Sequence, residues 1–332
     1  MSCGVILRMT DGPVSRLCPD PGVHSVTAAR DGHRYVVSYC DRSMSAIALG
    51  DYSDNTVKVI LVSDSETLYE RPVLASDGKI LFISRQTESE SMLCAVTIDG
   101  TGLARLLPND AGEKSNVLDF TLSKNEETVY YVNSEKFTNF SPLARPAPHK
   151  QDLYSLSRAT GQIKRLSFGK EYALPGIAIS LDEKKIYSHY RLFQLNKDQV
   201  TRRIGYGVEP SLGFFSKSLV YTSTYPLSAI SSSNEMVMSS GKAIKFDTAF
   251  NVTTPVVRGY GLYLVRLPEM DVVKELVYLP SYLDSPAYLE AEDTILFIRI
   301  DKVYGGKNGR ELWAVKRDGS GLKKIDLKLP VQ

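Results

Sequence analysis

Cysteine and histidine are both scarce in this chain of 332 residues, with four of each. The cysteines are Cys3, Cys18, Cys40 and Cys94, and the histidines are His24, His33, His149 and His189. No two cysteines form a Cys-x-x-Cys pair, and no two histidines have the His-Glu-x-x-His spacing of zinc peptidases. The sequence therefore contains no linear metal motif, although ligands contributed by distant segments would leave no such pattern.

The cysteines fall into two groups by position. Cys40 and Cys94 lie in or beside strand patterns, where an unpaired cysteine packs as a small apolar side chain. Cys3 and Cys18 flank a predicted hairpin, and an oxidising compartment would allow them to form a disulfide. Their spacing does not require this bond, so the sequence leaves the pairing of Cys3 and Cys18 open.

Long apolar runs are absent as well. No stretch approaches the roughly 18 apolar residues of a membrane-spanning helix, so we expect no membrane span. The first residues, Met-Ser-Cys-Gly-Val-Ile-Leu-Arg, lack the apolar core of a secretory signal. A native start would indicate a cytoplasmic protein, whereas removal of a signal would be compatible with the periplasm.

Strong charge and helical periodicity are also missing. The formal net charge is +2 and no run of five or more basic residues occurs, so we expect no nucleic-acid partner. No segment of helix length repeats its apolar residues every 3.6 positions, which excludes the α/β enzyme folds. Length alone would suggest two domains, but a repeat array of this size can be one domain.

The sequence does contain a repeated run of short strands. Residues 70–107 predict four strands, with Asp77-Gly78 and Asp99-Gly100 in two of the connections. Asp-Gly pairs reach the positive φ that tight hairpin turns need, and the β-branched runs between them are typical of strands. This segment therefore predicts one antiparallel sheet of four strands.

Similar units follow one another along the whole chain. We place them at 22–66, 70–107, 115–167, 173–207, 209–279 and 284–327, with a two-strand fragment at 4–17. Units of this length are typical of propeller blades, because radial packing covers both faces of every sheet. We predict an all-β propeller of six blades, each with four antiparallel strands, in a single domain over 1–332. Seven blades remain the alternative, because three explanations of 4–17 stay open: an additional edge, part of a seventh blade, or a wrong division of the fifth unit.

The repeat resembles the TolB-type propeller family. The resemblance is carried by Pro72, Ser76-Asp77-Gly78-Lys79 and Asp99-Gly100-Thr101-Gly102, and in the last unit by Pro286, Phe297 and Asp318-Gly319-Ser320-Gly321. It covers most of the chain and implies the propeller fold. It implies little about function, since such propellers occur in periplasmic scaffolds, peptidase gating domains and lyases. It also implies an envelope location, and no Gly-x-Ser-x-Gly motif of a hydrolase is present.

Three unusually long segments lie between predicted second and third strands, at 134–150, 226–258 and 301–310. In a propeller these connections share one face, and long loops often carry function. Aromatic and basic side chains are enriched in binding hot spots. The candidate partner-binding residues are Phe137, Phe140, Arg145, His149, Lys150, Tyr304, Lys307 and Arg310.

We therefore expect a non-catalytic scaffold that binds a protein or peptide on this face. Two alternatives remain open. One is a propeller lyase or hydrolase with a metal or a His/Asp/Tyr cluster at the central channel, and the other is a structural subunit of a larger assembly. The sequence predicts no catalytic residue and no cofactor, and leaves open a calcium or other divalent ion bound in the channel.

Overall fold

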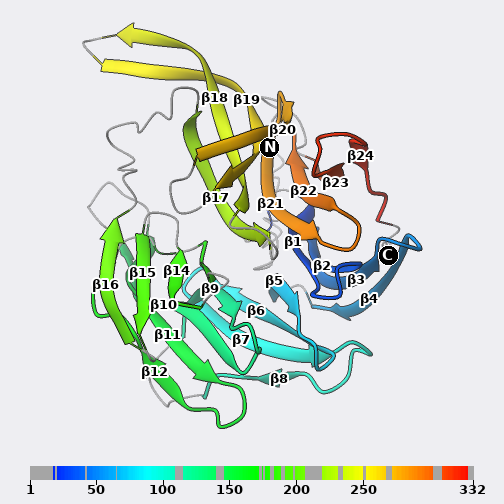
Figure 1. The fold of residues 1–332 in the computed structure, drawn as a ribbon. Helices are drawn as coiled ribbons and strands as arrows, with labels where there is room; N and C mark the ends of the chain where they lie inside the picture. The colour runs from blue at the N-terminus through cyan, green and yellow to red at the C-terminus, as the bar shows by residue number, and fades with distance from the viewer. Residues whose placement is uncertain are drawn as a thin grey trace, which may run out of the picture.

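The computed structural model describes residues 18, 21–41, 43–64, 66–108, 115–139, 146–171, 174, 176–179, 183–187, 191–196, 199–205, 219–230, 235–249, 252–266, 271–301 and 309–327. Every regular element in this part of the chain is a strand (Figure 1). Over the same residues no helix is long and apolar enough to cross a membrane. The fragment 4–17, predicted as a partial blade, lies outside the described residues.

The strands of the described residues form six sets of four in chain order. Sets 1 and 2 comprise β1 (Gly22–Ala28), β2 (Arg34–Cys40), β3 (Ser45–Asp51), β4 (Thr56–Val62), β5 (Leu68–Leu74), β6 (Lys79–Thr87), β7 (Glu90–Thr97) and β8 (Ala104–Arg105). Sets 3 and 4 comprise β9 (Val117–Leu122), β10 (Thr128–Asn139), β11 (Pro146–Ser157), β12 (Ile163–Arg165), β13 (Ala178–Ile179), β14 (Lys185–Tyr187), β15 (Arg191–Asn196) and β16 (Gln199–Gly205). Sets 5 and 6 comprise β17 (Leu219–Ile230), β18 (Glu235–Ala249), β19 (Val252–Arg266), β20 (Asp271–Leu279), β21 (Tyr282–Leu289), β22 (Thr294–Ile300), β23 (Arg310–Lys316) and β24 (Lys323–Lys324).

Each set is an antiparallel meander in which every strand pairs with the next one along the chain. Four sets form separate sheets, whereas sets 1 and 6 share one sheet of eight strands. They are joined by a single parallel bridge between Gly22 of β1 and Arg310 of β23. The two ends of the described chain are therefore hydrogen-bonded to each other.

Burial falls from the second strand to the fourth within a set. The run Ile80-Leu81-Phe82-Ile83 in β6 is fully buried, as is the corresponding run Ile295-Leu296-Phe297-Ile298 in β22. Continuous apolar runs of this kind are typical of strands that are covered on both faces. The fourth strands β8 and β24 are exposed, which places them at the outer edge.

Apolar clusters lie between successive sets. Sets 1 and 2 share a cluster around Ile47 and Phe82, sets 2 and 3 share one around Leu93 and Phe120, and sets 3 and 4 share one around Leu153. Two more clusters join sets 5 and 6 and sets 6 and 1. Sets 1, 2, 3 and 6 therefore pack on both faces, as expected of sheets arranged around a centre. The first strands lie toward that centre in Figure 1, where β1 contacts both β5 and β21.

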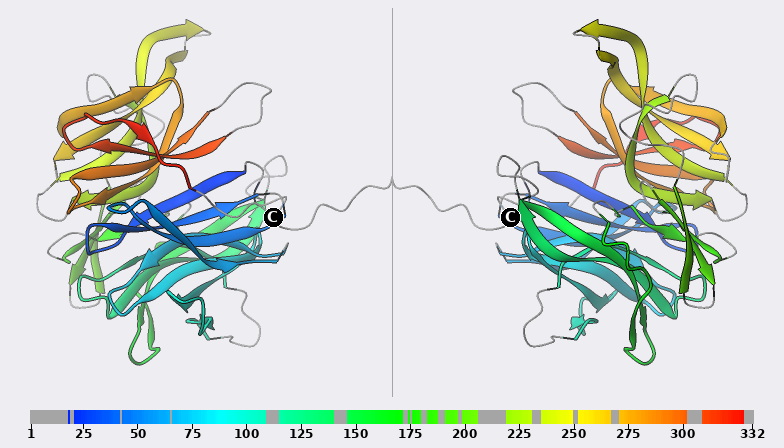
Figure 2. Two further views of the ribbon diagram at one scale, coloured as in Figure 1. Left: turned by 90° about the vertical axis from the view of Figure 1, so that its right-hand side faces the viewer. Right: turned by 90° about the vertical axis from the view of Figure 1, so that its left-hand side faces the viewer.

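The structure corrects the predicted fifth unit. We expected 219–223 to be a second strand followed by a long loop over 226–258. Instead, β17 is the first strand of set 5, and β18 and β19 are its long second and third strands. The small residues Ser239, Ser240 and Gly241 resemble a turn in the sequence, but they pair with both neighbouring strands inside β18. The hairpin of β18 and β19 projects from the body of the molecule (Figures 1 and 2).

The cysteine pairing also differs from the expectation. Cys18 forms a disulfide with Cys40, at a Cα–Cα distance of 6.3 Å, and not with Cys3. Cys40 is therefore a bonded residue and not a free apolar filler. Cys94 is a free, buried thiol, as its strand pattern suggested. The sequence did not indicate this pair because the two partners are brought together by strand pairing, with Gly22 opposite Cys40.

Candidate functional site

In every set the turn between the second and third strands lies at the same end of the strands. We call the face of the molecule formed by this end the hairpin face. In set 3 the hairpin is longer than its sheet. Strands β10 and β11 pair as far as Asn139 and Pro146, whereas pairing with β9 stops at Asn133 and pairing with β12 stops at Tyr154. The predicted loop 134–150 is thus largely a two-stranded extension of the sheet, and its tip at 140–145 lies outside the described residues.

Hydrogen bonds across this extension fix its base. His149 lies opposite Lys136, and its Nε2 is 2.7 Å from the carbonyl oxygen of Thr138. The hydroxyl of Ser134 donates to the carbonyl oxygen of His149 at 2.7 Å. The imidazole of His149 therefore stabilises the hairpin, in addition to any role at the surface.

The other predicted contact residues are distributed unevenly. Phe137 is half-buried opposite Pro148, and Lys150 is half-buried with a left-handed φ of 53°. Phe140, Arg145, Tyr304 and Lys307 lie outside the described residues. Their contact with a partner stays a prediction.

Arg310 occupies an internal position. Its side chain is 14% exposed, and its guanidinium donates to the carbonyl oxygen of Val23 at 2.9 Å. A second nitrogen lies 3.6 Å from the carboxylate of Asp284. Arg310 therefore holds set 1 against set 6, a role that its place beside a long loop did not suggest.

Phe168 is the most exposed large apolar side chain in the described part of the chain, at 74%. It follows β12, which runs back along β11 toward the base of the extended hairpin, where Gln151 bridges to Glu171. The Arg165 guanidinium lies 5.1 Å from the centre of the Phe168 ring. Sequence reasoning missed this pair. The available signal was an aromatic residue in the polar link Ser167-Phe168-Gly169, where the second unit has Pro108.

Arg165 is held in place by two carboxylates. It forms ion pairs with Asp152, which is fully buried, at 2.5 Å and with Glu135 on the hairpin at 2.8 Å. The hydroxyl of Ser167 also donates to Asp152, at 2.7 Å. These charged hydrogen bonds hold the Arg165 side chain, and the Phe168 ring packs against it. Fewer side-chain conformations are then lost on binding, which lowers the entropy cost of a contact with a partner.

A chain of buried polar contacts, which we call the polar belt, links four strand sets near the first strands. The Arg71 amide donates to the hydroxyl of Ser25 at 3.1 Å, and its guanidinium pairs with the carboxylate of Asp119. Asp119 in turn accepts hydrogen bonds from the amides of Gly176 and Ile177, at 2.6 and 2.8 Å. A bulge in β5 between Glu70 and Val73 leaves Arg71 out of the ladder, whereas Ser25 pairs with Ser38 directly after the bulge of β1.

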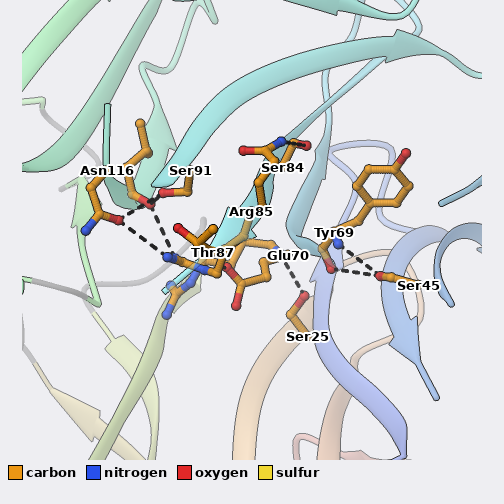
Figure 3. Close-up of polar contacts among 12 residues, drawn as sticks. Ser25, Ser45, Tyr69, Glu70, Ser84, Arg85, Thr87, Ser91 and Asn116 are labelled. Atoms are coloured by element: carbon orange, nitrogen blue, oxygen red, sulfur yellow. Dashed lines mark hydrogen bonds and ion pairs between the residues drawn. The ribbon is translucent and has the colours of Figure 1, made fainter. Parts of the chain in front are cut away.

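Figure 3 shows the neighbouring part of the belt, between sets 2 and 3. Arg85 pairs with Glu70 at 2.7 Å and reaches the side-chain oxygen of Asn116. The hydroxyl of Ser91 donates to the same oxygen at 3.1 Å. The Nδ2 of Asn116 is buried and has no hydrogen-bond partner among the described residues.

Asp284 is the acidic group of the belt in set 6. Burial raises the pKa of its carboxyl group, while the nearby charges of Arg310 and Arg71 and a hydrogen bond from the Ser285 amide oppose this rise. A buried carboxyl group whose pKa is raised is a common element of catalytic and ion-binding sites, but structural networks contain such groups as well.

No family model matches this sequence, and no curated protein matches it either. Solved structures do match. A luciferin-regenerating enzyme superimposes with a TM-score of 0.59 at 13% identity, over 93% of this chain and 96% of that one. TolB from Acinetobacter baumannii gives a TM-score of 0.55 at 12% identity, over 86% of this chain and 62% of that one.

The fold is that of a TolB-like β-propeller. An oligogalacturonate lyase in complex with manganese matches as well, with a TM-score of 0.53 at 9% identity, over 94% of this chain and 80% of that one. Proteins of this shape thus include enzymes as well as TolB, and identities this low establish the fold alone.

Proposed function

We propose that the chain is a closed propeller of six blades that binds a protein or peptide partner on its hairpin face. Closure is supported by the bridge between Gly22 and Arg310 and by the apolar cluster that sets 1 and 6 share. A closed ring gives the projecting hairpins a rigid base. The same rigidity lets a binding surface form without large ordering costs.

The observation that carries the proposal is the exposure of Phe168 beside Arg165. A side chain of this size that is 74% exposed gives up apolar contact with water when a partner covers it. Aromatic and arginine side chains dominate the energetics of protein interfaces. Both residues lie at the base of the hairpin in which β10 and β11 continue past the end of their four-stranded sheet. A partner that covers Phe168 therefore also contacts the hairpin.

The hairpin itself offers a second mode of contact. Beyond Ser134, whose amide donates to the carbonyl oxygen of Asn116, no described strand pairs with β10 on its β9 side. Pro146 and Pro148 lie on the β11 strand, where each removes one amide donor. The β10 edge is therefore the better site for an extended peptide that adds as a strand.

The test is site-specific photo-crosslinking in the cells that make the protein. A photoreactive phenylalanine analogue replaces Phe168 in one variant and Leu103 in the control. Leu103 is 55% exposed but lies in the turn between third and fourth strands, at the opposite end of its sheet. We expect a discrete crosslinked protein from position 168 and none from position 103.

A second variant tests the hairpin. Residues 135–150 are replaced by Asn-Gly, which leaves the pair of Ser134 and Gln151 to close a short turn. We expect the crosslink at position 168 to disappear while the circular dichroism spectrum and melting temperature stay close to those of the parent. A crosslink that persists in this variant, or one that forms equally at position 103, would contradict the proposed face.

A second candidate function is a catalytic or metal site at the polar belt, and Asp284 is the observation that favours it. Its carboxyl group, on a side chain that is 19% exposed, lies near two arginines, which suits an anionic substrate better than calcium or another divalent ion. Metal analysis of the purified protein distinguishes the two. A stoichiometric ion that is lost in Asp284→Asn would support a metal site there.

A further inference from the structure

Three potential metal ligands meet at the start of set 1. Cys18 precedes β1, His24 lies at the bulge of β1 between Val23 and Ser25, and Cys40 ends β2. The Sγ atoms of the two cysteines and a ring nitrogen of His24 all lie within 4.8 Å of one another. The Nε2 atom of His24 is 3.7 Å from the Sγ of Cys18.

These groups are the ligand types that zinc prefers. Thiolate and imidazole suit a borderline-soft divalent ion, and sites with three protein ligands leave the fourth position to water or another ligand. In the oxidised protein the two sulfurs are bonded to each other and neither is a thiolate. The same three residues therefore have two mutually exclusive uses.

We propose that reduction of the Cys18–Cys40 disulfide converts this cluster into a binding site for Zn²⁺, with both thiolates and His24 as ligands. The reductant is a dithiol, which is oxidised to its own disulfide while the protein gains two thiols. Zinc then replaces the two thiol protons, which go to solvent, and forms two Zn–S bonds and one Zn–N bond. The reverse exchange, in which the oxidised dithiol accepts two electrons from the two thiolates and two protons from solvent, forms the Cys18–Cys40 disulfide again and releases the ion.

The geometry requires little movement. Two sulfurs bound to tetrahedral zinc at about 2.3 Å lie about 3.8 Å apart, so reduction has to separate them only to this distance. Both cysteines are fully buried, and Leu68 packs against them. A buried pair of thiolates needs a nearby cation, which the metal would supply. His24 is half-buried and gives an entry path from solvent.

The redox state of the two cysteines would therefore decide which cross-link, disulfide or zinc, lies at the junction of sets 1 and 6. Gly22 lies between two of the ligands in sequence and forms the bridge to Arg310. The disulfide and the metal both tie the segment at Cys18 to β2, whereas the reduced, metal-free form lacks either tie. Zinc would therefore replace the disulfide as the cross-link in a reducing environment.

Cys94 provides an internal control. It is buried in a different cluster, and burial raises the pKa of its thiol to about 11. It therefore remains protonated at neutral pH and has no His partner in the described structure. A Cys94→Ser variant is expected to bind metal as the parent does.

The experiment uses the full chain with Cys3→Ser, so that this fourth cysteine contributes no ligand. The protein is reduced with a phosphine under argon and titrated with Co²⁺, then with Zn²⁺ as competitor. We expect one cobalt per chain with the thiolate charge-transfer band and intense d–d bands of a tetrahedral site, and displacement by zinc. The oxidised protein is expected to show none of these bands.

His24→Ala keeps both cysteines and the disulfide, so its oxidised form reports whether the fold is intact. Loss of one ligand should weaken zinc binding by at least about 100-fold, the upper end of the cost of losing an outer-shell partner. No cobalt bands in the reduced parent would overturn the proposal. So would equal binding by the oxidised protein, or unchanged affinity in His24→Ala.

Discussion

At the residue scale, Asp119 of set 3 contacts two other strand sets of the polar belt. Its carboxylate, 3% exposed, pairs with Arg71 of set 2 and accepts the amides of Gly176 and Ile177 that precede set 4. Asp119→Asn removes the charge and points an amide donor at one of these partners. Because breaking a buried ion pair leaves the other charge unpaired, we expect a loss of about 3 kcal/mol in the free energy of unfolding.

Urea unfolding at neutral pH measures this loss. The control is Lys324→Ala, which removes a pair with Glu311 whose side chains are 52% and 30% exposed. Exposed pairs contribute less than about 1 kcal/mol, so this variant should unfold close to the parent. Equal losses in both variants would mean that Asp119 has no special role in joining the sets.

Asp99 gives the protein a predicted response to acid. A hydrogen bond from the Thr97 hydroxyl, followed by bonds from the amide and hydroxyl of Thr101, lowers the pKa of Asp99 to about 2. A carboxyl group whose pKa is lower in the folded state stabilises the fold above its unfolded pKa of about 4. This stabilisation is lost as the pH falls from about 4 to about 2.

Comparison of Asp99→Asn with the parent tests this response. Melting temperatures are measured between pH 5 and pH 2, a window set by those two pKa values. The difference between the two proteins should be largest near pH 5 and shrink toward pH 2. A difference that stays constant over this range would show that the turn hydrogen bonds do not depend on the charge of Asp99.

At the element scale, the sequence predicted most strands because their local signals agree. In set 2, the apolar run 80–83 and the turns at Gly78 and Gly100 all indicate the same meander, and β5 to β8 follow it. Set 5 shows where such signals fail. Its second strand contains Ser239-Ser240-Gly241, whose turn propensity is overridden by pairing on both sides. Pairing between distant segments decides such positions, and local propensity does not record it.

The candidate site was less predictable than the fold for the same reason. The segments between second and third strands are unusually long in the sequence, so the hairpin face could be predicted from their length. Phe168 could not, since its exposure depends on how β12 returns along β11. The disulfide and the chain from Arg71 to Asp119 likewise join residues of different strands or sets. No spacing rule connects residues that meet only through the arrangement of sheets.

At the scale of the whole molecule, the Asp-Gly turns also fit neighbouring sets together. Gly100, with a φ of 88°, lies in the turn after the third strand of set 2, and a Cβ added to it would lie 2.7 Å from the carbonyl oxygen of Ile60 in set 1. Gly319 has the same relation to Leu276 of set 5, at 2.8 Å. These glycines therefore permit both the turn and the close approach of the adjacent sheet. Gly78, with a φ of 76°, has open space around it.

This difference predicts unequal effects of the same substitution. Gly78→Ala carries only the cost of a left-handed φ, about 1–2 kcal/mol. Gly100→Ala carries that cost and also pushes two sheets apart, and overpacking adds about 1–3 kcal/mol. Thermal unfolding should therefore show a larger fall in melting temperature for Gly100→Ala than for Gly78→Ala, and Gly319→Ala should match Gly100→Ala. Equal falls for all three variants would mean that the turns act alone and that neighbouring sheets adjust around them freely.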